Sequence, residues 1–147
     1  ATLKDVLLSP EKRPLLLEDC HRLLDAEVAK KRGLSGKLLQ GAYKTVSKIK
    51  PGFVRGVMNL LLGEWMEELQ PEYEAFQASD DADSFGGYLL QRKDMVAERM
   101  LAVTDRRAAN TVHKTAGKLY NRLRGGAKAQ VIESLPGAAV VLDRHLP

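Results

Sequence analysis

The fold is decided by the stretch Phe53-Val-Arg-Gly-Val-Met-Asn-Leu-Leu-Leu-Gly-Glu-Trp-Met-Glu-Glu-Leu69. Its apolar residues recur at helical spacing, and between Phe53 and Leu62 they cover most of the helix circumference. A helix that is apolar on several sides packs on several sides, so we expect this one at the centre of an all-α domain. Gly56 and Gly63 lie seven residues apart on one face, where we expect a neighbouring backbone to approach closely.

Further helices are expected on both sides of this central one. Ser9-Pro10 and Ser35 are signals for helix starts, because serine caps a helix and proline suits its first turn. Pro14 also suits a first turn and would shift the first of these starts. The polar run over residues 79–84 has no periodicity and is expected to be a loop. Pro71 is expected to break or kink the central helix, and Pro136 to end a short one, since proline cannot donate a helical hydrogen bond.

These signals predict a single domain over residues 1–147, folded as a compact bundle of about seven helices. Residues 35–63 resemble residues 109–137 at an offset of 74 positions. The identical pairs are Ala42 with Ala116, Lys44 with Lys118, Gly52 with Gly126, Val57 with Val131, Leu61 with Leu135 and Gly63 with Gly137. An internal duplication would give two related halves in a pseudo-two-fold arrangement. The alternative is a shared need to pack one helix against the next through a glycine.

Composition and cysteine content favour a globular cytoplasmic protein. Apolar residues make up 44% of the chain, yet no apolar run approaches the roughly 20 residues of a membrane span. The first residues lack a basic segment followed by an apolar one, so we expect no secretory signal. Cys20 is the single cysteine and cannot form an internal disulfide, which suits a reducing cytoplasm.

The net charge of +4 is divided into blocks along the chain. Residues 28–63 carry eight bases and no acid, residues 56–91 carry eight acids and no base, and residues 106–132 carry seven bases and no acid. Basic side chains one helical turn apart can follow a phosphate backbone. The candidate anion-binding residues are Lys37, Lys44, Lys48, Lys114, Lys118, Arg122 and Arg124. The alternative, which we favour, is a solvated helix face or neutralisation by the acidic block from Glu64 to Asp83.

Two motifs resemble known sites but lack necessary parts. Glu18 and His21 have the Glu-x-x-His spacing of di-iron bundles, but no second such pair exists, so a surface or core-edge histidine is the better interpretation. Gly33-Leu-Ser-Gly-Lys37 has neither the spacing of a P-loop nor the sheet of a KH domain, and a cap glycine followed by a capping serine is expected instead. We therefore assign no catalytic, metal-binding or cofactor-binding residue.

Several short runs together resemble a family of small uncharacterised bacterial proteins. They include Leu7-Leu-Ser-Pro10, Asp25-Ala-Glu-Val-Ala29, Ile49-Lys-Pro-Gly52, Ala102-Val-Thr-Asp105 and Leu135-Pro136, and they extend over nearly the whole chain. The resemblance implies an all-helical fold of bacterial cytoplasmic origin. It brings no activity, ligand, partner or site residue.

Three functions are considered from the sequence. The first is a non-enzymatic helical interaction or scaffold protein, acting as a homo-oligomer or with a protein partner. The second is a binder of an anionic partner through the basic helix faces, nucleic acid before lipid. The third is an enzyme or small-ligand carrier with a pocket between helices. Cys20 and Trp65 share apolar stripes with leucines and are expected to be buried and structural.

Overall fold

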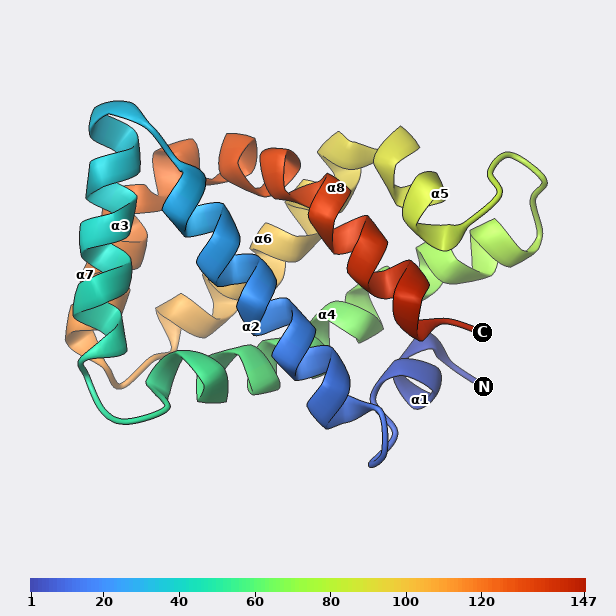
Figure 1. Cartoon of the computed structure of the whole chain (residues 1–147), viewed down its shortest axis with the longest axis horizontal. Coiled ribbons are helices and arrows are strands. Elements are labelled where there is room, and N and C mark those ends of the chain that lie inside the picture. Colours follow the sequence, from blue (N-terminus) through green and yellow to red (C-terminus); the bar gives the residue numbers. More distant parts are fainter.

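The computed structural model describes residues 1–147, which form helices joined by short connections (Figure 1). This confirms the all-α prediction. The elements are α1 (Leu3–Leu7), α2 (Arg13–Lys30), α3 (Gly33–Ser47), α4 (Phe53–Gln77), α5 (Phe85–Gln91), α6 (Lys93–Ala109), α7 (Lys114–Leu123), a 3₁₀ turn (Arg124–Gly126) and α8 (Ala127–His145). None of these helices is long and apolar enough to cross a membrane.

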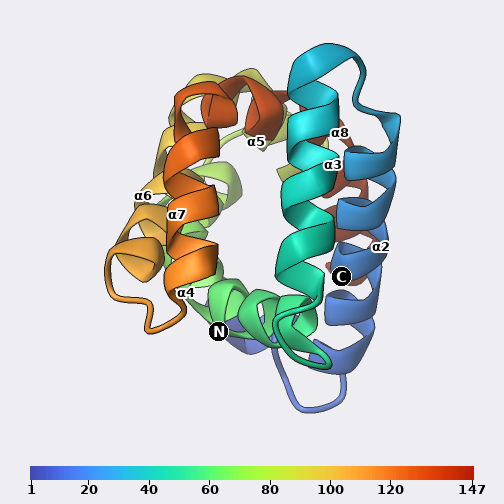
Figure 2. The ribbon, with the colours of Figure 1, turned by 90° about the vertical axis from the view of Figure 1, so that its left-hand side faces the viewer.

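Four long helices, α2, α4, α6 and α8, surround the interior of the molecule. Helix α4 packs against α2 and α6, and α8 packs against the same two helices from the other side. The short helices α1 and α5 lie near the two chain termini, against α4 and α8 respectively (Figure 1). Helices α3 and α7 lie side by side across the opposite end, as the end-on view in Figure 2 shows. The bundle is therefore a ring of four long helices, with the α3–α7 pair across one end and α1 and α5 packed separately on α4 and α8 at the other.

Helix α4 has the central position expected of it. Its buried residues recur along most of its length and are Phe53, Met58, Leu61, Leu62, Met66, Leu69, Glu72 and Tyr73. The leucines of α1, Leu3 and Leu7, are fully buried, and the backbone N–H of Leu3 donates to the side-chain oxygen of Gln70 on α4 at 2.7 Å. Both the apolar pattern and this hydrogen bond fix α1 against α4.

The prolines do not end the helices as expected. Pro71 lies inside α4 and Pro136 inside α8, and both helices continue beyond them. Each proline is on the exposed side of its helix, where water can bond the carbonyl oxygen that the missing N–H leaves free.

Other helix boundaries also differ from the prediction. Helix α2 begins at Arg13 rather than at Ser9-Pro10, with Pro14 in its first turn. Helix α3 begins at Gly33, which has a left-handed φ of 72°, so Ser35 lies inside the helix. The loop over residues 79–84 is confirmed, and Ser84 caps α5 by accepting a hydrogen bond from Gly87 N.

Close backbone approach occurs at other glycines than those expected. A Cβ on Gly56 would meet no atom within 4 Å, and one on Gly63 would meet only the side chain of Lys4. At Gly86, by contrast, a Cβ would lie 2.7 Å from the carbonyl oxygen of Ala139 on α8. The absence of a side chain at Gly86 thus allows α5 to lie directly on α8.

The two sequence windows that resemble each other fold in the same order. Residues 35–63 cover most of α3, a short connection and the start of α4. Residues 109–137 cover α7, the 3₁₀ turn and the first half of α8. The pseudo-two-fold relation of the halves stays a prediction.

Candidate ligand-binding site

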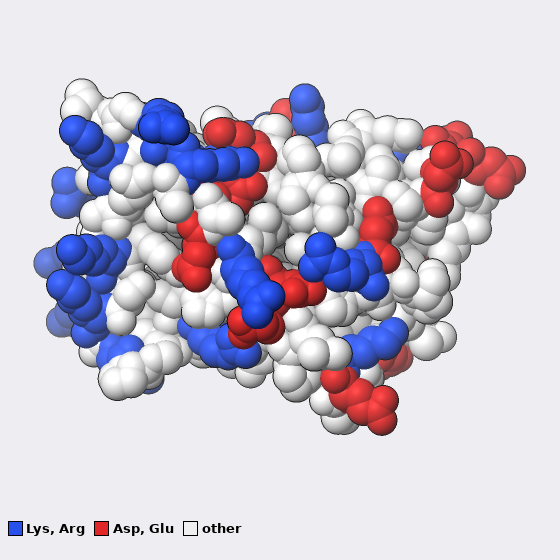
Figure 3. Space-filling model, in the orientation of Figure 1, with Lys and Arg blue, Asp and Glu red and all other residues white.

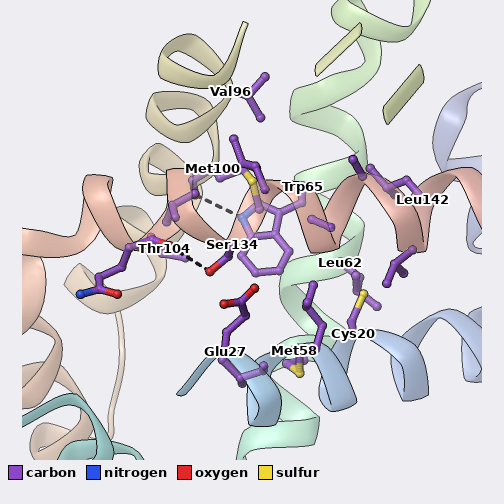
Figure 4. Close-up of a pocket in the computed structure, with 18 of the residues that line it drawn as sticks. Cys20, Glu27, Met58, Leu62, Trp65, Val96, Met100, Thr104, Ser134 and Leu142 are labelled. Atoms are coloured by element: carbon purple, nitrogen blue, oxygen red, sulfur yellow. Dashed lines mark hydrogen bonds between the residues drawn. The ribbon is translucent and has the colours of Figure 1, made fainter. Parts of the chain in front are cut away.

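A pocket of about 310 Å³, partly open to the surface, lies within the ring formed by α2, α4, α6 and α8 (Figure 4), and we call it the cavity. Twenty of its 25 lining residues are hydrophobic. Protein interiors are otherwise packed as densely as organic crystals, with few voids larger than a water molecule. A space of this size therefore needs an explanation beyond imperfect packing.

Flexible and aromatic side chains form much of the wall. Trp65 is partly buried, and its indole N–H donates to the carbonyl oxygen of Met100 at 3.1 Å, which fixes the ring along one side of the cavity (Figure 4). Met58, Met66 and Met100 also line it, so three of the four methionines of the chain are here. Methionine has three rotatable bonds and a polarisable sulfur, so such a wall can adapt to the shape of an occupant.

Polar side chains gather at one end of the cavity. They are Glu27 and Lys31 from the last turns of α2, Thr104 from the second half of α6, and Gln130 and Ser134 from the first half of α8. These parts of α2, α6 and α8 adjoin α3 and α7, and Leu39 of α3 completes the lining there. Little polar surface of these five residues faces the cavity, so its wall is almost wholly apolar, and the polar end is only the part where these five side chains lie.

The charges at this polar end are paired but imperfectly bonded. Glu27 is 8% exposed, and its Oε2 lies 2.7 Å from Nζ of Lys30. Nζ of Lys31 lies 3.1 Å from Oε2 of Glu133 and 3.9 Å from Oε2 of Glu27. Neither Glu27 Oε2 nor Lys31 Nζ has the geometry of a hydrogen bond in these contacts. The buried side-chain oxygen of Gln130 has no hydrogen-bond partner at all.

Cys20 also lines the cavity and is partly rather than fully buried. Its burial, and to a lesser degree the nearby charge of Asp19, raise the pKa of the thiol to about 11. A thiol with so high a pKa is almost entirely protonated at neutral pH and is a poor nucleophile. The structural role expected for Cys20 agrees with this environment.

The Glu18–His21 pair does not form a metal site. Glu18 is paired with Arg22 and Arg55, and Nε2 of half-buried His21 lies 3.9 Å from Oδ1 of Asp25. No group of three or more His, Cys, Asp or Glu side chains is placed to hold a metal ion.

The candidate anion-binding residues lie together at the α3–α7 end. Six of them are exposed and form no ion pair within the protein: Lys37 and Lys44 on α3, Lys48 directly after it, and Lys114, Lys118 and Arg122 on α7. The seventh, Arg124, is different, because its guanidinium donates to both carboxylate oxygens of Asp105, at 2.8 and 3.2 Å. Anion binding by these residues stays a prediction.

The acidic block forms no ion pair with these six residues, so of the two alternatives favoured from the sequence the solvated helix face remains and neutralisation does not. Glu64 pairs with Arg107 and Glu67 with Lys4. Glu68 and Glu72 both pair with Arg99 of α6. The reason is topological, since α4 carries these glutamates along its second half, away from the end at which α3 and α7 lie.

The cavity was not found from the sequence. Its lining comes from α2, α3, α4, α5, α6 and α8, and no local pattern records how side chains from separate helices fill the space between them. A weak signal existed in the single tryptophan and the methionines on the inward faces of α4 and α6, which we assigned to an ordinary core.

A family model matches residues 3–146, and its description reads "Family of unknown function (DUF6918)". No curated protein and no solved structure matches the chain. Because the match covers nearly the whole chain, the resemblance to an uncharacterised family is confirmed, and the protein belongs to this family of unknown function, DUF6918.

Proposed function

We propose that the protein is a non-enzymatic binding protein that holds a small, mainly apolar molecule in the cavity between α2, α4, α6 and α8. The observation that carries this proposal is the size of the cavity together with its lining. A buried apolar cavity of about 150 Å³ is large enough to bind benzene, and known ligand pockets begin at about 300 Å³. At about 310 Å³, this cavity suits an occupant of roughly a dozen non-hydrogen atoms, twice the size of benzene.

The polar end of the cavity suggests the chemistry of one end of the ligand. The unpaired side-chain oxygen of Gln130 can only accept a hydrogen bond. Leaving a buried acceptor unpaired costs about 1–3 kcal/mol, which a donor on the ligand would recover. The ligand class that fits is an apolar chain or ring system with a hydrogen-bond donor, such as a hydroxyl group, at one end.

Binding is favoured over catalysis by the state of the reactive groups. Glu27 and Lys31 face other charges rather than a free reacting centre, and the raised pKa of Cys20 disfavours its thiolate. Of the three functions considered from the sequence, the small-ligand carrier is therefore the one that the cavity supports. We further propose a cytoplasmic location, because the free thiol of Cys20 suits a reducing compartment.

A series of straight-chain alcohols tests the proposal. Trp65 is the only tryptophan and lines the cavity, so displacement of water around its ring should shift its emission when 1-hexanol to 1-dodecanol is added. Each added methylene is worth about 0.8 kcal/mol on burial, which is roughly a fourfold gain in affinity per carbon. We expect this gain to continue until the cavity is full and then to stop. Affinity that does not depend on chain length, or no binding measured by calorimetry, would contradict the proposal.

Two variants test whether the alcohols bind in the cavity. Ala138 lines the cavity on α8, so Ala138→Leu, which fills part of the space with three carbon atoms, should make the gain in affinity stop at an alcohol about three carbons shorter. Ala29 on α2 is exposed, and Ala29→Leu should bind like the original protein.

The polar end is tested by 1-methoxydecane, which lacks the hydroxyl donor and should bind roughly tenfold more weakly than 1-decanol.

A further inference from the structure

The α3–α7 end carries a surface that the ligand cavity does not explain. We call it the basic end and define it by the six unpaired residues Lys37, Lys44, Lys48, Lys114, Lys118 and Arg122. Lys44 lies seven residues after Lys37, which puts both on one face of α3, and Lys48, the residue that caps the end of the helix, continues this face. The residues on α7 follow one another at intervals of four, so they also share a face.

The charge of the molecule is polarised along its long axis. In Figure 3 the Lys and Arg side chains gather over α3 and α7, whereas Asp and Glu side chains cover the connection between α4 and α5 at the other end. That connection contains Asp80, Asp81 and Asp83. Helices α3 and α7 themselves contain no acidic residue. An anionic surface would therefore attract the basic end and repel the opposite end.

Large apolar side chains are exposed at the same end. Leu34 and Leu38 on α3 are 86% and 42% exposed, and Val112, just before α7, is 87% exposed. Helix α7 has no buried residue along its whole length, although its sequence is strongly amphipathic. Basic side chains beside exposed aliphatic ones are the composition of helices that lie in the interface of a membrane.

We propose that the basic end docks on the surface of an anionic lipid bilayer, with the lysines at the headgroups and Leu34 and Val112 inserted between them. This goes beyond the ligand proposal and does not depend on it. Nucleic acid is the less suitable partner because the aliphatic side chains would gain nothing from phosphates. The tyrosines of this end also offer no stacking surface, since the hydroxyl groups of Tyr43 and Tyr120 donate to Asp25 and Asp105 and their rings are half-buried.

Docking in this orientation would bring the cavity towards the bilayer. The polar residues of the cavity come from the parts of α2, α6 and α8 that adjoin α3 and α7, and Leu39 of α3 lines the cavity itself. A molecule that passes between the bilayer and the cavity would then have a short path.

Co-sedimentation with vesicles tests the proposal. We expect the protein to bind vesicles of 30% phosphatidylglycerol in phosphatidylcholine at 50 mM salt, and to bind pure phosphatidylcholine vesicles weakly. Each basic residue near an anionic bilayer is worth roughly a fivefold change in affinity. The variant Lys44→Gln, Lys48→Gln, Lys114→Gln, Lys118→Gln should therefore bind more than about a hundredfold more weakly. Salt at 500 mM should also weaken binding by the original protein, because it screens surface charge.

A matched variant controls for net charge. Lys4→Gln, Arg22→Gln, Lys93→Gln, Arg144→Gln removes the same charge from α1, α2, α6 and α8 and should bind vesicles nearly as well as the original protein. Circular dichroism melts of both variants should show that each remains folded. Equal loss of binding in the two variants would overturn the proposal, because it would show a response to net charge alone.

A second pair of measurements separates lipid from nucleic acid. Leu34→Ser, Val112→Ser keeps every charge and should weaken vesicle binding at least about fivefold, since it removes the inserted apolar groups. If this variant binds vesicles like the original protein, or if the original protein binds a duplex DNA oligonucleotide more tightly than vesicles, docking on lipid is overturned. The alcohol titration monitored by Trp65 is run on the same samples, so failure of the docking proposal is distinguishable from failure of the ligand proposal.

Discussion

Enlarging a single side chain in the cavity should stabilise the protein. Ala138 lies on α8, is half-buried and lines the cavity, and leucine in its place adds three carbon atoms. Burying them is worth about 0.8 kcal/mol each, or about 2.4 kcal/mol together. Ordering the longer side chain costs about 0.5–1 kcal/mol. We therefore expect Ala138→Leu to raise the free energy of unfolding by about 1.5–2 kcal/mol.

Chemical and thermal unfolding measure this change directly. For a chain of this length, 1 kcal/mol corresponds to a shift in Tm of roughly 2–4 °C, so an increase of about 3–8 °C is expected. The matched change Ala29→Leu, on the exposed face of α2, should alter the free energy of unfolding by less than about 0.5 kcal/mol. Since both changes are alanine to leucine within a helix, helix propensity cancels in the comparison.

Whether Ala138→Leu raises or lowers the free energy of unfolding shows whether the space beside Ala138 is open. If the space at Ala138 were already filled, the added atoms would have to displace their neighbours. Overpacking a well-filled core costs about 1–3 kcal/mol. A lower Tm for Ala138→Leu, with Ala29→Leu unchanged, would refute the existence of an open cavity at this position.

Three further predictions concern other parts of the molecule. Gly86→Ala should destabilise the protein by more than about 1 kcal/mol, because its Cβ would overlap the backbone of α8. Gly56→Ala, where the space is open, should instead stabilise it by about 0.5–1 kcal/mol. Denaturant unfolding of the two variants checks both signs. Cys20, with its pKa raised to about 11 by burial, should react with a bulky maleimide at pH 8 far more slowly in the native than in the unfolded protein, and more slowly still with 1-decanol bound. Asp105 has its pKa held below the usual 3.8, chiefly by hydrogen bonds from Arg124, so its contribution to stability is present above about pH 4 and lost as the pH falls. Unfolding of Asp105→Asn should accordingly show a weaker decline between pH 5 and pH 2 than unfolding of the original protein.

Local patterns predicted those parts of the fold that depend on local chemistry. The apolar periodicity of residues 53–69 placed α4 in the core, and the polar run over residues 79–84 was recognised as a loop. The helix end predicted at Pro136 is wrong, and Pro71 does not break α4. The cost of a proline depends on whether its side of the helix is exposed or buried. Both prolines are exposed, and that property is set by tertiary packing rather than by neighbouring residues.

The charge pattern of the sequence indicated which segments are basic or acidic, but not which side chains form ion pairs with one another. The basic residues of α3 and α7 were singled out as candidate anion-binding residues, and they lie at one end of the molecule. Their lack of partners could not be deduced, because ion pairs join helices distant in the chain. Arg99 of α6 forms ion pairs with both Glu68 and Glu72 of α4. It lies outside the two basic blocks and the acidic block of the sequence. This arrangement leaves the basic end without internal partners.

The candidate ligand site is the feature that sequence reasoning missed. A cavity is the difference between the volume that a ring of helices encloses and the volume of the side chains that point into it. Neither quantity can be read from one helix at a time. A fully packed core could have the same leucines and methionines at the same positions of the sequence.

Xenon binding in a crystal is the most direct test of the central claim, that an open apolar cavity lies inside the four-helix ring. Xenon enters dry apolar cavities of this kind and is visible through its strong scattering. In a crystal kept under xenon pressure, we expect xenon between α2, α4, α6 and α8, in contact with Trp65 and Met100. Absence of xenon from this position, with side chains of the four helices filling the space, would contradict the account.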